Sequence, residues 1–405
     1  MSLRAEVPPT AGLPLQFDDL FGGVADLEDT MAALLRVPRP QLACSGTVCL
    51  LIALLTLKRR SPRRNRVIVP AYTCPLVALA IHHAGLRTVP CDLRSNHFDF
   101  DPDRLAGLCD ERTLAVVPTH LGGRLADVEM AVAAARQCGA HVIEDAAQSL
   151  GARQQGASVG LRGDAGFFSL AAGKGLTTFE GGLLVARDAQ LREELAWTGE
   201  RLAVRRAGWE LRRSIELLGY WLFYRPRLLG LVHGLPRRRA LARGDPLAAV
   251  GDRFAAAIPQ HRMGRWRAAV AARASARLPA FLSLATAQAR RRIARLRAID
   301  GLRVLDDPAE SGSGVWPLIM LLQPRPAQRD SVMRQLWASP LGVSRMFIHA
   351  LPDYPQLAGL LEASEVPRAR EFAGRMLTLS NSPWLDDAGF EQVVGVLQAA
   401  PASAP

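Results

Sequence analysis

The stretch RVIVPAYTCPLVALAIHHAGLRTVPCDL, residues 66–93, contains two apolar strand patterns separated by a helical pattern. Residues 66–72 form a β-branched run that ends in a turn, 75–85 form a helical pattern closed by glycine, and 86–93 form the next strand pattern. Apolar strands connected through a helix are typical of a parallel sheet that is buried on both faces. The stretch therefore predicts a strand–helix–strand unit of an α/β fold.

The alternation continues on both sides of this unit. A helix is predicted at 48–57 after the sequence SGT, strands are predicted at 113–121 and 140–148, and a second helix is predicted at 127–139. The chain thus predicts a mostly parallel sheet flanked by helices. Ligands bind at the carboxyl ends of such strands, so we expect functional residues directly after them.

The length of the chain, 405 residues, is enough for two domains. Residues 1–37 are predicted to form an N-terminal extension with a short helix near 26–35. Residues 38–252 would form the large α/β domain, which carries an arginine-rich, aromatic insertion at about 200–250. Residues 253–405 begin with a long helical pattern and then alternate again, which predicts a smaller C-terminal α/β domain.

The composition excludes several classes of protein. Apolar residues make up 49% and charged residues 22%, which is typical of a packed globular chain rather than a disordered one. No stretch reaches about 18 consecutive apolar residues, and the N-terminal residues do not resemble a signal peptide. The six cysteines form no CxxC pair and have no zinc-like spacing, so we expect reduced thiols, a cytoplasmic protein and no metal site.

The stretch SLAAGKGLTTFEGG, residues 169–182, holds Lys174, one of only two lysines in a chain that otherwise uses arginine. One interpretation is a simple turn residue. A phosphate loop of the GxxxxGK[ST] type is excluded, because Phe168 and Gly175 occupy the positions that need glycine and a hydroxyl residue. The third interpretation is a Schiff-base lysine, since a desolvated lysine amine is a nucleophile and arginine is not.

Other residues at predicted strand ends suit a pyridoxal phosphate site. Asp145 ends the strand HVIED, a position from which a carboxylate can keep the pyridine nitrogen protonated. Residues 45–47, Ser-Gly-Thr, precede a helix, where backbone N–H groups bind phosphate, and Ser169 lies near Lys174. Each feature also has an ordinary role as a cap or turn residue, but their combination in one α/β domain indicates this cofactor.

The sequence resembles the nucleotide-sugar aminotransferases of the DegT/StrS type, which are pyridoxal-phosphate-dependent and have the aspartate-aminotransferase fold (type I). The blocks VIEDAAQSLGA (142–152) and FFSLAAGKGL (167–176) carry the resemblance most specifically. The resemblance covers most of residues 40–400, except about 200–250. It implies a large cofactor-binding domain followed by a smaller C-terminal domain.

The resemblance also implies roles for individual residues. Lys174 would carry the Schiff base and move the proton during transamination, and Asp145 would pair with the pyridinium nitrogen. The other implied contacts are Gln148 with the ring hydroxyl, His120 as a catalytic residue beside the site, Glu180 as an acid after the lysine loop, and Gly46, Thr47 and Ser169 around the phosphate.

The chain departs from the family pattern at two places. Cys74 stands where the family usually has an aromatic residue stacked on the cofactor ring, so Cys74 is expected beside the ring. At 200–250 the family usually supplies loop residues that reach across a dimer interface, and the insertion cannot be aligned with them. The resemblance therefore assigns no residue of the insertion to the site.

The insertion holds most of the net charge of the chain, which is +12. Between Arg201 and Asp245, eleven arginines stand against three carboxylates, a local charge of +8. Aromatic residues are mixed with arginines at 209–235, so a helix there could make peripheral contact with a membrane interface. The alternative is a helix packed on a dimer partner. Nucleic acid is not an expected partner, because no binding motif accompanies the charge.

The resemblance implies a pyridoxal-phosphate-dependent aminotransferase, expected as a cytoplasmic homodimer with its active site at the interface. It would move an amino group from a donor such as glutamate to a nucleotide-linked keto-sugar, in polysaccharide or natural-product sugar biosynthesis. The alternatives are an enzyme of this fold acting on a lipid-linked or non-sugar ketone at the membrane surface, and a catalytically silent regulatory relative. Lys174 disfavours the dehydratase branch of the family, in which histidine is expected at that position.

Overall fold

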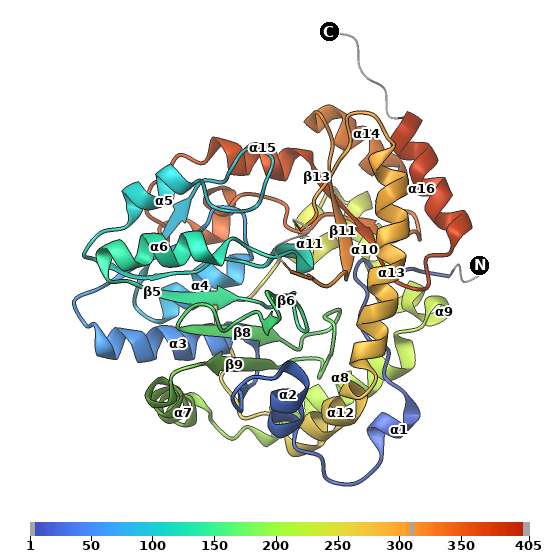
Figure 1. Ribbon diagram of the computed structural model, residues 1–405. Coiled ribbons are helices and arrows are strands. Elements are labelled where there is room, and N and C mark those ends of the chain that lie inside the picture. The colour runs from blue at the N-terminus through green and yellow to red at the C-terminus, as the bar shows by residue number, and fades with distance from the viewer. Residues whose placement is uncertain (1–4, 308–311, 400–405) are drawn as a thin grey trace.

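The computed structural model describes residues 5–307 and 312–399 (Figure 1). The predicted segments 1–37 and 253–405 include residues outside this part of the chain. The main feature is a seven-stranded sheet in the order β1-β9-β8-β5-β4-β2-β3. The strands are β1 (Gln41–Ala43), β2 (Arg66–Pro70), β3 (Arg87–Cys91), β4 (Thr113–Val116), β5 (His141–Asp145), β8 (Ala165–Ser169) and β9 (Gly182–Ala186).

The predicted fold class is confirmed. Strands β3, β2, β4, β5 and β8 pair in parallel, whereas β9 is antiparallel to both of its neighbours, β8 and β1. Six of the seven strands therefore point in one direction. Their carboxyl ends lie at one edge of the sheet, which is the edge where α/β proteins bind ligands.

Helices cover both faces of this sheet. On one face lie α3 (Gly46–Arg60), α4 (Pro75–His83) and α7 (Ala189–Leu202), which share one apolar core with the strands. On the other face, α5 (Pro102–Leu108) and α6 (Val128–Cys138) share a second core. The bounds agree with sequence signals: Asp127 caps α6 at its start, and Gly139 ends α6 in the left-handed conformation, with φ of 67°.

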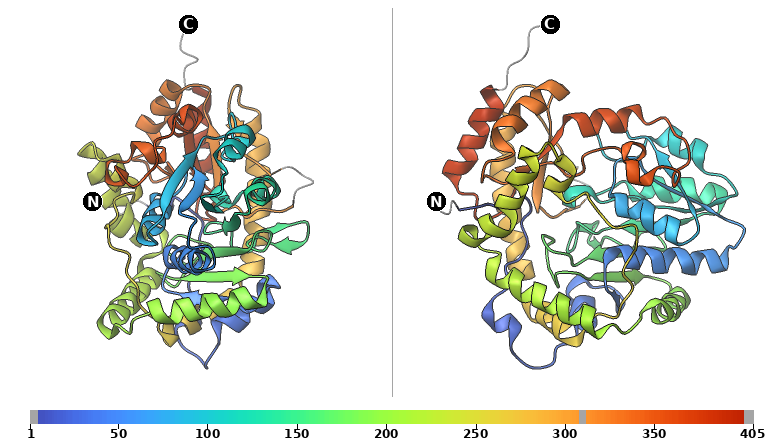
Figure 2. Two further views of the ribbon diagram at one scale, coloured as in Figure 1. Left: turned by 90° about the vertical axis from the view of Figure 1, so that its left-hand side faces the viewer. Right: turned by 180° about the vertical axis from the view of Figure 1, so that it is seen from behind.

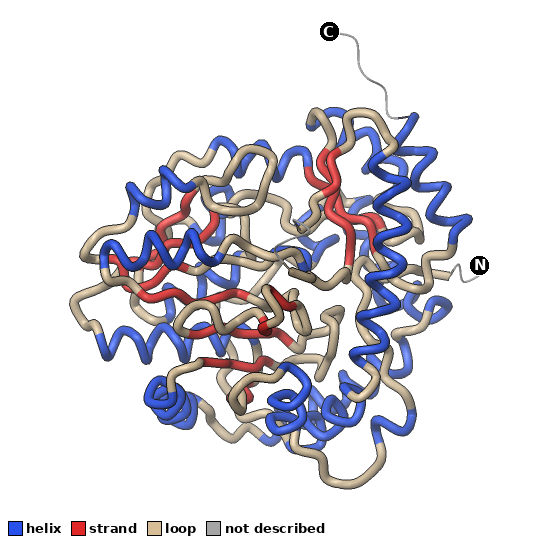
Figure 3. Tube along the Cα trace, viewed as in Figure 1, coloured by secondary structure: helices blue, strands red, loops and turns tan. Residues whose placement is uncertain are grey.

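A second sheet lies beside the first, and Figure 3 shows the two as separate groups of red strands. Its order is β10-β11-β13-β12, and all of its pairs are antiparallel. Its strands are β10 (Arg303–Val304), β11 (Leu318–Leu322), β12 (Val343–Ser344) and β13 (Met376–Ser380). It packs with α13 (Leu278–Arg297), α14 (Pro326–Leu336) and α16 (Asp387–Ala399). The small domain thus has the predicted α/β composition, while its boundary at residue 252 stays a prediction.

The remaining elements are short or peripheral. They are α1 (Phe17–Leu20), α2 (Leu27–Leu35), the hairpin of β6 (Arg153–Gln154) and β7 (Ala157–Ser158), α12 (Arg265–Ser275), α15 (Pro367–Arg375), and the 3-10 turns η1 (Leu121–Gly123), η3 (Leu351–Asp353) and η4 (Pro355–Leu357). No helix within residues 5–307 and 312–399 has the length and apolar character needed to cross a membrane.

The insertion forms several helices rather than one. They are α8 (Ala207–Phe223), α9 (Pro226–Leu229), the π-helical turn η2 (Gly230–Gly234), α10 (Leu235–Ala242) and α11 (Pro246–Val250). The single helix expected at 209–235 is divided because Pro226 cannot continue the hydrogen bonding of α8. In the right-hand view of Figure 2, these helices lie along the side of the molecule that faces the viewer.

Candidate active site

One cavity brings most of the predicted site residues together. It lies at the carboxyl ends of β2, β4, β5 and β8, next to the start of α3, and has a volume of about 360 Å³. This volume is within the usual range for small-molecule and cofactor sites. The predicted residues that line the cavity are Gly46, Thr47, Cys74, Asp145, Gln148, Ser169, Lys174 and Glu180.

Lys174 lies in the loop between β8 and β9 and lines the cavity without a hydrogen bond from its Nζ to the described residues. Desolvation lowers the pKa of its ammonium group below the ordinary value, and the nearby Cys74 and Asp145 counteract this only in part. A larger fraction of the Lys174 amine is therefore neutral than in an exposed lysine. A neutral amine is the form that attacks a carbonyl.

The loop that carries Lys174 is held by the N-terminal segment. Thr10 Oγ1 donates to the carbonyl oxygen of Gly173 at 2.7 Å, and Leu13 N donates to the carbonyl oxygen of Gly175 at 3.0 Å. Gly173 has a φ of 80°, a conformation in which a side chain would be strained. These contacts on both sides fix the backbone of Lys174.

Asp145 ends β5, and only 4% of its surface is exposed. Its carboxylate accepts one hydrogen bond from the described residues, from Ala147 N at 3.0 Å. Burial raises the pKa of the Asp145 carboxyl, although this hydrogen bond and the positive charge of Lys174 act in the opposite direction. A desolvated carboxylate with so few partners fits a protonated ring nitrogen, which would compensate its charge.

The start of α3 provides a cradle for an anion. Ser45 caps the helix, and its Oγ accepts a hydrogen bond from Val48 N at 3.2 Å. A Cβ atom on Gly46 would lie 3.2 Å from Ser169 Cβ, so glycine permits the close approach of the helix start to β8. Thr47 and Ser169 line the same part of the cavity. Free backbone N–H groups and two hydroxyl groups suit a phosphate.

Gln148 follows β5, and contacts of both its amide oxygen and its amide nitrogen fix the orientation of its side chain. Its Oε1 accepts a hydrogen bond from Gly122 N at 2.6 Å, and its Nε2 lies 3.4 Å from Met346 Sδ. The sulfur is a weak acceptor, so the amide N–H groups keep capacity for a ligand hydroxyl. This geometry fits the predicted contact with the ring hydroxyl of the cofactor.

His120 is not among the residues that line the cavity, unlike the other predicted site residues. Its ring is fully buried, with Nε2 at 3.0 Å from Glu144 Oε2, and Nδ1 accepts a hydrogen bond from Ala126 N. Both ring nitrogens are therefore used within the protein. The structure makes His120 a partner of Glu144 behind β5, rather than a group that faces Lys174.

Glu144 is a buried acid that the sequence analysis missed. It accepts hydrogen bonds from the backbone N–H groups of Gly160 and Gly163 at 2.8 and 2.9 Å, in addition to the contact with His120. Burial alone would raise the pKa of Glu144, but these hydrogen bonds and His120 lower it overall. The sequence did hold a signal for this role of Glu144. It precedes Asp145 on the same strand, and neighbouring side chains of a strand point to opposite faces of the sheet.

The insertion supplies the surroundings of Glu180, which no sequence pattern indicated. The carboxylate of Glu180 forms an ion pair with Arg213, and Trp209 Nε1 lies 3.4 Å from it. Arg267 of α12 is fully buried and donates to the carbonyl oxygens of Thr178 and Glu180 at 3.0 and 2.6 Å. Helix α8 therefore packs directly against the wall of the Lys174 cavity.

Cys74 lies beside the cavity at the start of α4, and burial raises the pKa of its thiol to about 12. The thiol is therefore neutral and small, and it cannot stack on a ring as an aromatic residue would. Phe347 lines the same cavity and packs edge-on against Tyr72, with ring centroids 5.6 Å apart. Two aromatic residues, Phe167 and Phe347, line the cavity. No sequence pattern indicated Phe347, because it lies far along the chain from the other lining residues.

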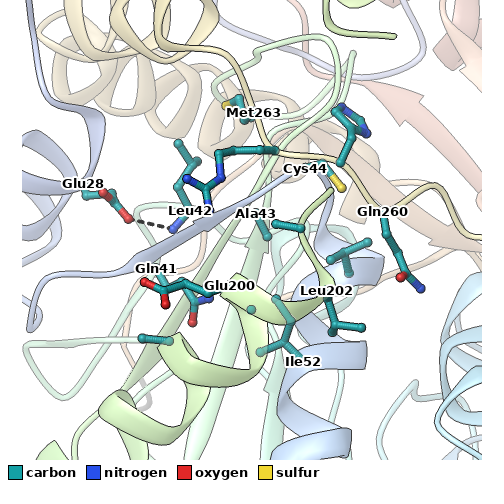
Figure 4. A pocket seen from close by; sticks show the side chains of 16 residues that line it. Glu28, Gln41, Leu42, Ala43, Cys44, Ile52, Glu200, Leu202, Gln260 and Met263 are labelled. Carbon is teal, nitrogen blue, oxygen red and sulfur yellow. Dashed lines mark hydrogen bonds between the residues drawn. The ribbon is translucent and has the colours of Figure 1, made fainter. Parts of the chain in front are cut away.

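A second cavity lies on the other side of residues 257–263. Residues 257–259 line the Lys174 cavity, whereas residues 260–263 line the second one, together with Glu28, Gln41 and Cys44 (Figure 4). None of the predicted site residues lies in it. Within the described part of the chain, no cluster of histidine, cysteine or acidic residues could hold a metal ion.

Comparison with known proteins gives a match to one family model. The model of the DegT/DnrJ/EryC1/StrS aminotransferase family matches residues 21–220. A putative L-glutamine:3-amino-2,3-dideoxy-scyllo-inosose aminotransferase of Streptomyces kanamyceticus is 34% identical over 197 residues, which are 46% of each chain. A UDP-N-acetyl-3-dehydro-alpha-D-glucosamine 3-aminotransferase of Acidithiobacillus ferrooxidans is 31% identical over 245 residues, 59% of this chain and 61% of the relative. The chain thus spans about half the length of the curated relatives it matches.

Solved structures match over almost the whole chain. PseC of Helicobacter pylori, described as an aminotransferase involved in the biosynthesis of pseudoaminic acid, has a TM-score of 0.75 at 16% identity and covers 98% of this chain and 99% of its own. The putative sugar aminotransferase Spr1654 of Streptococcus pneumoniae has a TM-score of 0.74 at 17% identity, with 98% of both chains covered. These two matches show the fold. Residues 21–220, which contain both Asp145 and Lys174, match the DegT/DnrJ/EryC1/StrS aminotransferase family.

Proposed function

We propose that this protein is a pyridoxal-phosphate-dependent aminotransferase. The observation that carries the proposal is that the desolvated Lys174 and the buried Asp145 line one cavity at the carboxyl ends of parallel strands. Pyridoxal phosphate, when bound, supplies the carbonyl that accepts the amino group and the electron sink that makes the substrate Cα–H acidic. The match of residues 21–220 to an aminotransferase family model supports this assignment.

The chain's own residues would divide the work. Asp145 holds a proton at the ring nitrogen, because its buried carboxylate needs a cationic partner. Gly46, Thr47 and Ser169 bind the phosphate at the start of α3. Lys174 would move a proton at the reacting carbon, since its lowered pKa leaves a larger fraction of the amine neutral than in an exposed lysine. His120 stays a proposed contributor, acting through Glu144 as a positioning residue.

The relatives support a keto-sugar carried on a nucleotide as the acceptor of the amino group. One relative is named UDP-N-acetyl-3-dehydro-alpha-D-glucosamine 3-aminotransferase and another GDP-perosamine synthase. A third is the spore coat polysaccharide biosynthesis protein SpsC of Bacillus subtilis, which supports a setting in polysaccharide biosynthesis. We propose glutamate as the amino donor. The names of two further relatives contain L-glutamine, so glutamine is the donor to compare first.

We also propose a cytoplasmic homodimer with the active site near its interface. Six free cysteines, none of them in a disulfide, support a reducing compartment. A second candidate substrate is a lipid-linked ketone used at a membrane surface. Exposed apolar side chains on α8, the helix that contacts the cavity wall at Glu180, favour this candidate.

The absorbance of the purified protein tests the cofactor assignment. Wild-type protein should show a visible band that borohydride bleaches, with the cofactor then fixed at Lys174 in a peptide map. Lys174→Ala should lack the fixed cofactor. Lys58→Ala is the matched control because Lys58 is the other lysine of the chain and only binds the carbonyl oxygens of Ala84 and Gly85. A folded wild-type protein that takes up no pyridoxal phosphate would refute the proposal.

A further inference from the structure

Helix α8 has a solvent-exposed apolar side. Leu211, Ile215, Leu218 and Leu222 are exposed by 63, 58, 40 and 46%. Their spacing of four, three and four residues places them in one row along the helix. The opposite side of α8 is also apolar and is buried, with Leu217 in the core. The buried side of α8 is covered by the core of the protein, whereas its exposed apolar side has no such cover among the described residues. An exposed apolar surface of this kind marks a site of contact with a partner or a membrane.

The apolar row continues onto the N-terminal segment. Phe17 and Phe21, each 61% exposed, lie against each other with tilted rings whose centroids are 4.8 Å apart. The ring of Phe17 lies 6.2 Å from that of Trp221 on α8. In Figure 1, α1 and α8 lie close together at the lower right of the molecule. We call the six residues Phe17, Phe21, Leu211, Ile215, Leu218 and Leu222 the apolar face.

Arginines stand at both ends of the row on α8. Arg205 and Arg206 precede the helix, and Arg225 and Arg227 follow it; all four are exposed and form no ion pair with the described residues. By contrast, Arg213 on the buried side is paired with Glu180 and Glu216. The positive charge beside the apolar face is therefore not neutralised within the chain.

We propose that the apolar face docks on an anionic membrane surface. Apolar side chains of a helix that lies in the interface enter the acyl region, while arginines at its ends reach lipid phosphate groups. Each such arginine near an anionic surface adds to the electrostatic attraction. A second copy of the chain fits less well, because a two-fold contact between identical surfaces would bring the unpaired guanidinium groups of both copies together.

Docking in this manner would place the active site close to the lipid. Trp209 and Arg213 on the inner side of α8 touch Glu180, which lines the Lys174 cavity. The cavity is thus separated from the apolar face by roughly the diameter of one helix, about 10 Å. A substrate held at the headgroup level of the membrane would be within reach.

Co-sedimentation with lipid vesicles tests the proposal on the full-length protein loaded with pyridoxal phosphate. We expect binding to phosphatidylcholine vesicles that contain phosphatidylglycerol, much weaker binding to pure phosphatidylcholine, and a loss of binding as salt is raised. The triple variant Ile215→Ser, Leu218→Ser, Leu222→Ser should bind about tenfold or more weakly, because it removes apolar area that enters the acyl region.

The matched control is Leu284→Ser, which changes a leucine on α13 that is 73% exposed and far from α8 in sequence. The control should bind as wild type, and all variants should keep the visible absorbance band, which shows that the fold and the cofactor site are intact. Arg225→Gln with Arg227→Gln should weaken binding and reduce its dependence on salt.

Three outcomes would overturn the proposal. The first is wild-type protein that does not sediment with the anionic vesicles. The second is a triple variant that binds them as well as wild type does. The third is a change of oligomeric state without vesicle binding. If light scattering shows that the wild type is a dimer and the triple variant a monomer, and neither protein binds vesicles, a second copy of the chain covers the apolar face.

Discussion

The chemistry at the residue scale depends on how two side chains are desolvated. Lys174 has a lowered pKa because the cavity partly removes it from water, and Asp145 has a raised pKa because it is buried. The two shifts have opposite signs because desolvation disfavours the charged form of either group. The cavity therefore favours the neutral form of the amine and holds a carboxyl that gains from a cationic neighbour.

The pH dependence of cofactor uptake follows from the shift at Lys174. Only the neutral amine attacks the carbonyl of pyridoxal phosphate, so the uptake rate of the cofactor-free protein should rise with pH. The midpoint should lie below 10.5, the ordinary lysine value, because the pKa of Lys174 is lowered. Stopped-flow absorbance at a series of pH values measures this rate. A midpoint at or above 10.5 would show that Lys174 is not desolvated in solution.

At the scale of elements, α8 and α12 support the loop that carries the site. Arg267 of α12 joins the carboxylate of Glu210 on α8 to two carbonyl oxygens that follow Lys174 in the chain. Arg267 is fully buried, and the carboxylate of Glu210 compensates its charge. The insertion is thus part of the active-site scaffold.

Glu210→Ala should lower the free energy of unfolding by about 3 kcal/mol, because it leaves the buried guanidinium of Arg267 without its charge partner. Glu216→Ala on the same helix removes partly exposed ion pairs with Arg212 and Arg213 and should cost only about 1 kcal/mol or less. Urea unfolding of both variants measures the difference. Equal losses would mean that Arg267 does not depend on Glu210.

At the scale of the whole molecule, the N-terminal segment connects the insertion to the active-site loop. Glu6 is fully buried and accepts from Arg237 and Arg238 of α10 at 2.6 and 2.8 Å. A few residues later, Gly12 N donates to the hydroxyl of Tyr224 at 3.2 Å, and Leu13 holds the loop at Gly175. The N-terminal segment and the helices α8 and α10 therefore form one layer against the loop that carries Lys174.

Glu6→Ala should loosen this layer, because it leaves Arg237, only 3% exposed, without a carboxylate. Hydrogen exchange should then become faster at the amide of Leu13 and in residues 171–180, which that segment holds. Glu365→Ala changes an exposed acid and serves as the control. Unchanged exchange in both segments of the Glu6 variant would show that the Glu6 contacts do not support the loop.

The sequence by itself determined the local elements and pointed to the pair of residues on which the proposed site rests. Strands β2 to β5 and helices α3, α4 and α6 appear where the periodicity and the glycine and cap residues predict them, because these signals act within one turn or one strand. Asp145 and Lys174 could be named because both follow strands of a parallel sheet, whose carboxyl ends meet at one edge.

Only the tertiary structure decided what surrounds that pair. It turned the ring of His120 toward Glu144, brought Phe347 to the cavity, and set α8 and the N-terminal segment against the lysine loop. It also left the apolar face exposed. These contacts join residues up to hundreds of positions apart, and no periodicity encodes them, because they depend on which surfaces remain after the local elements have packed.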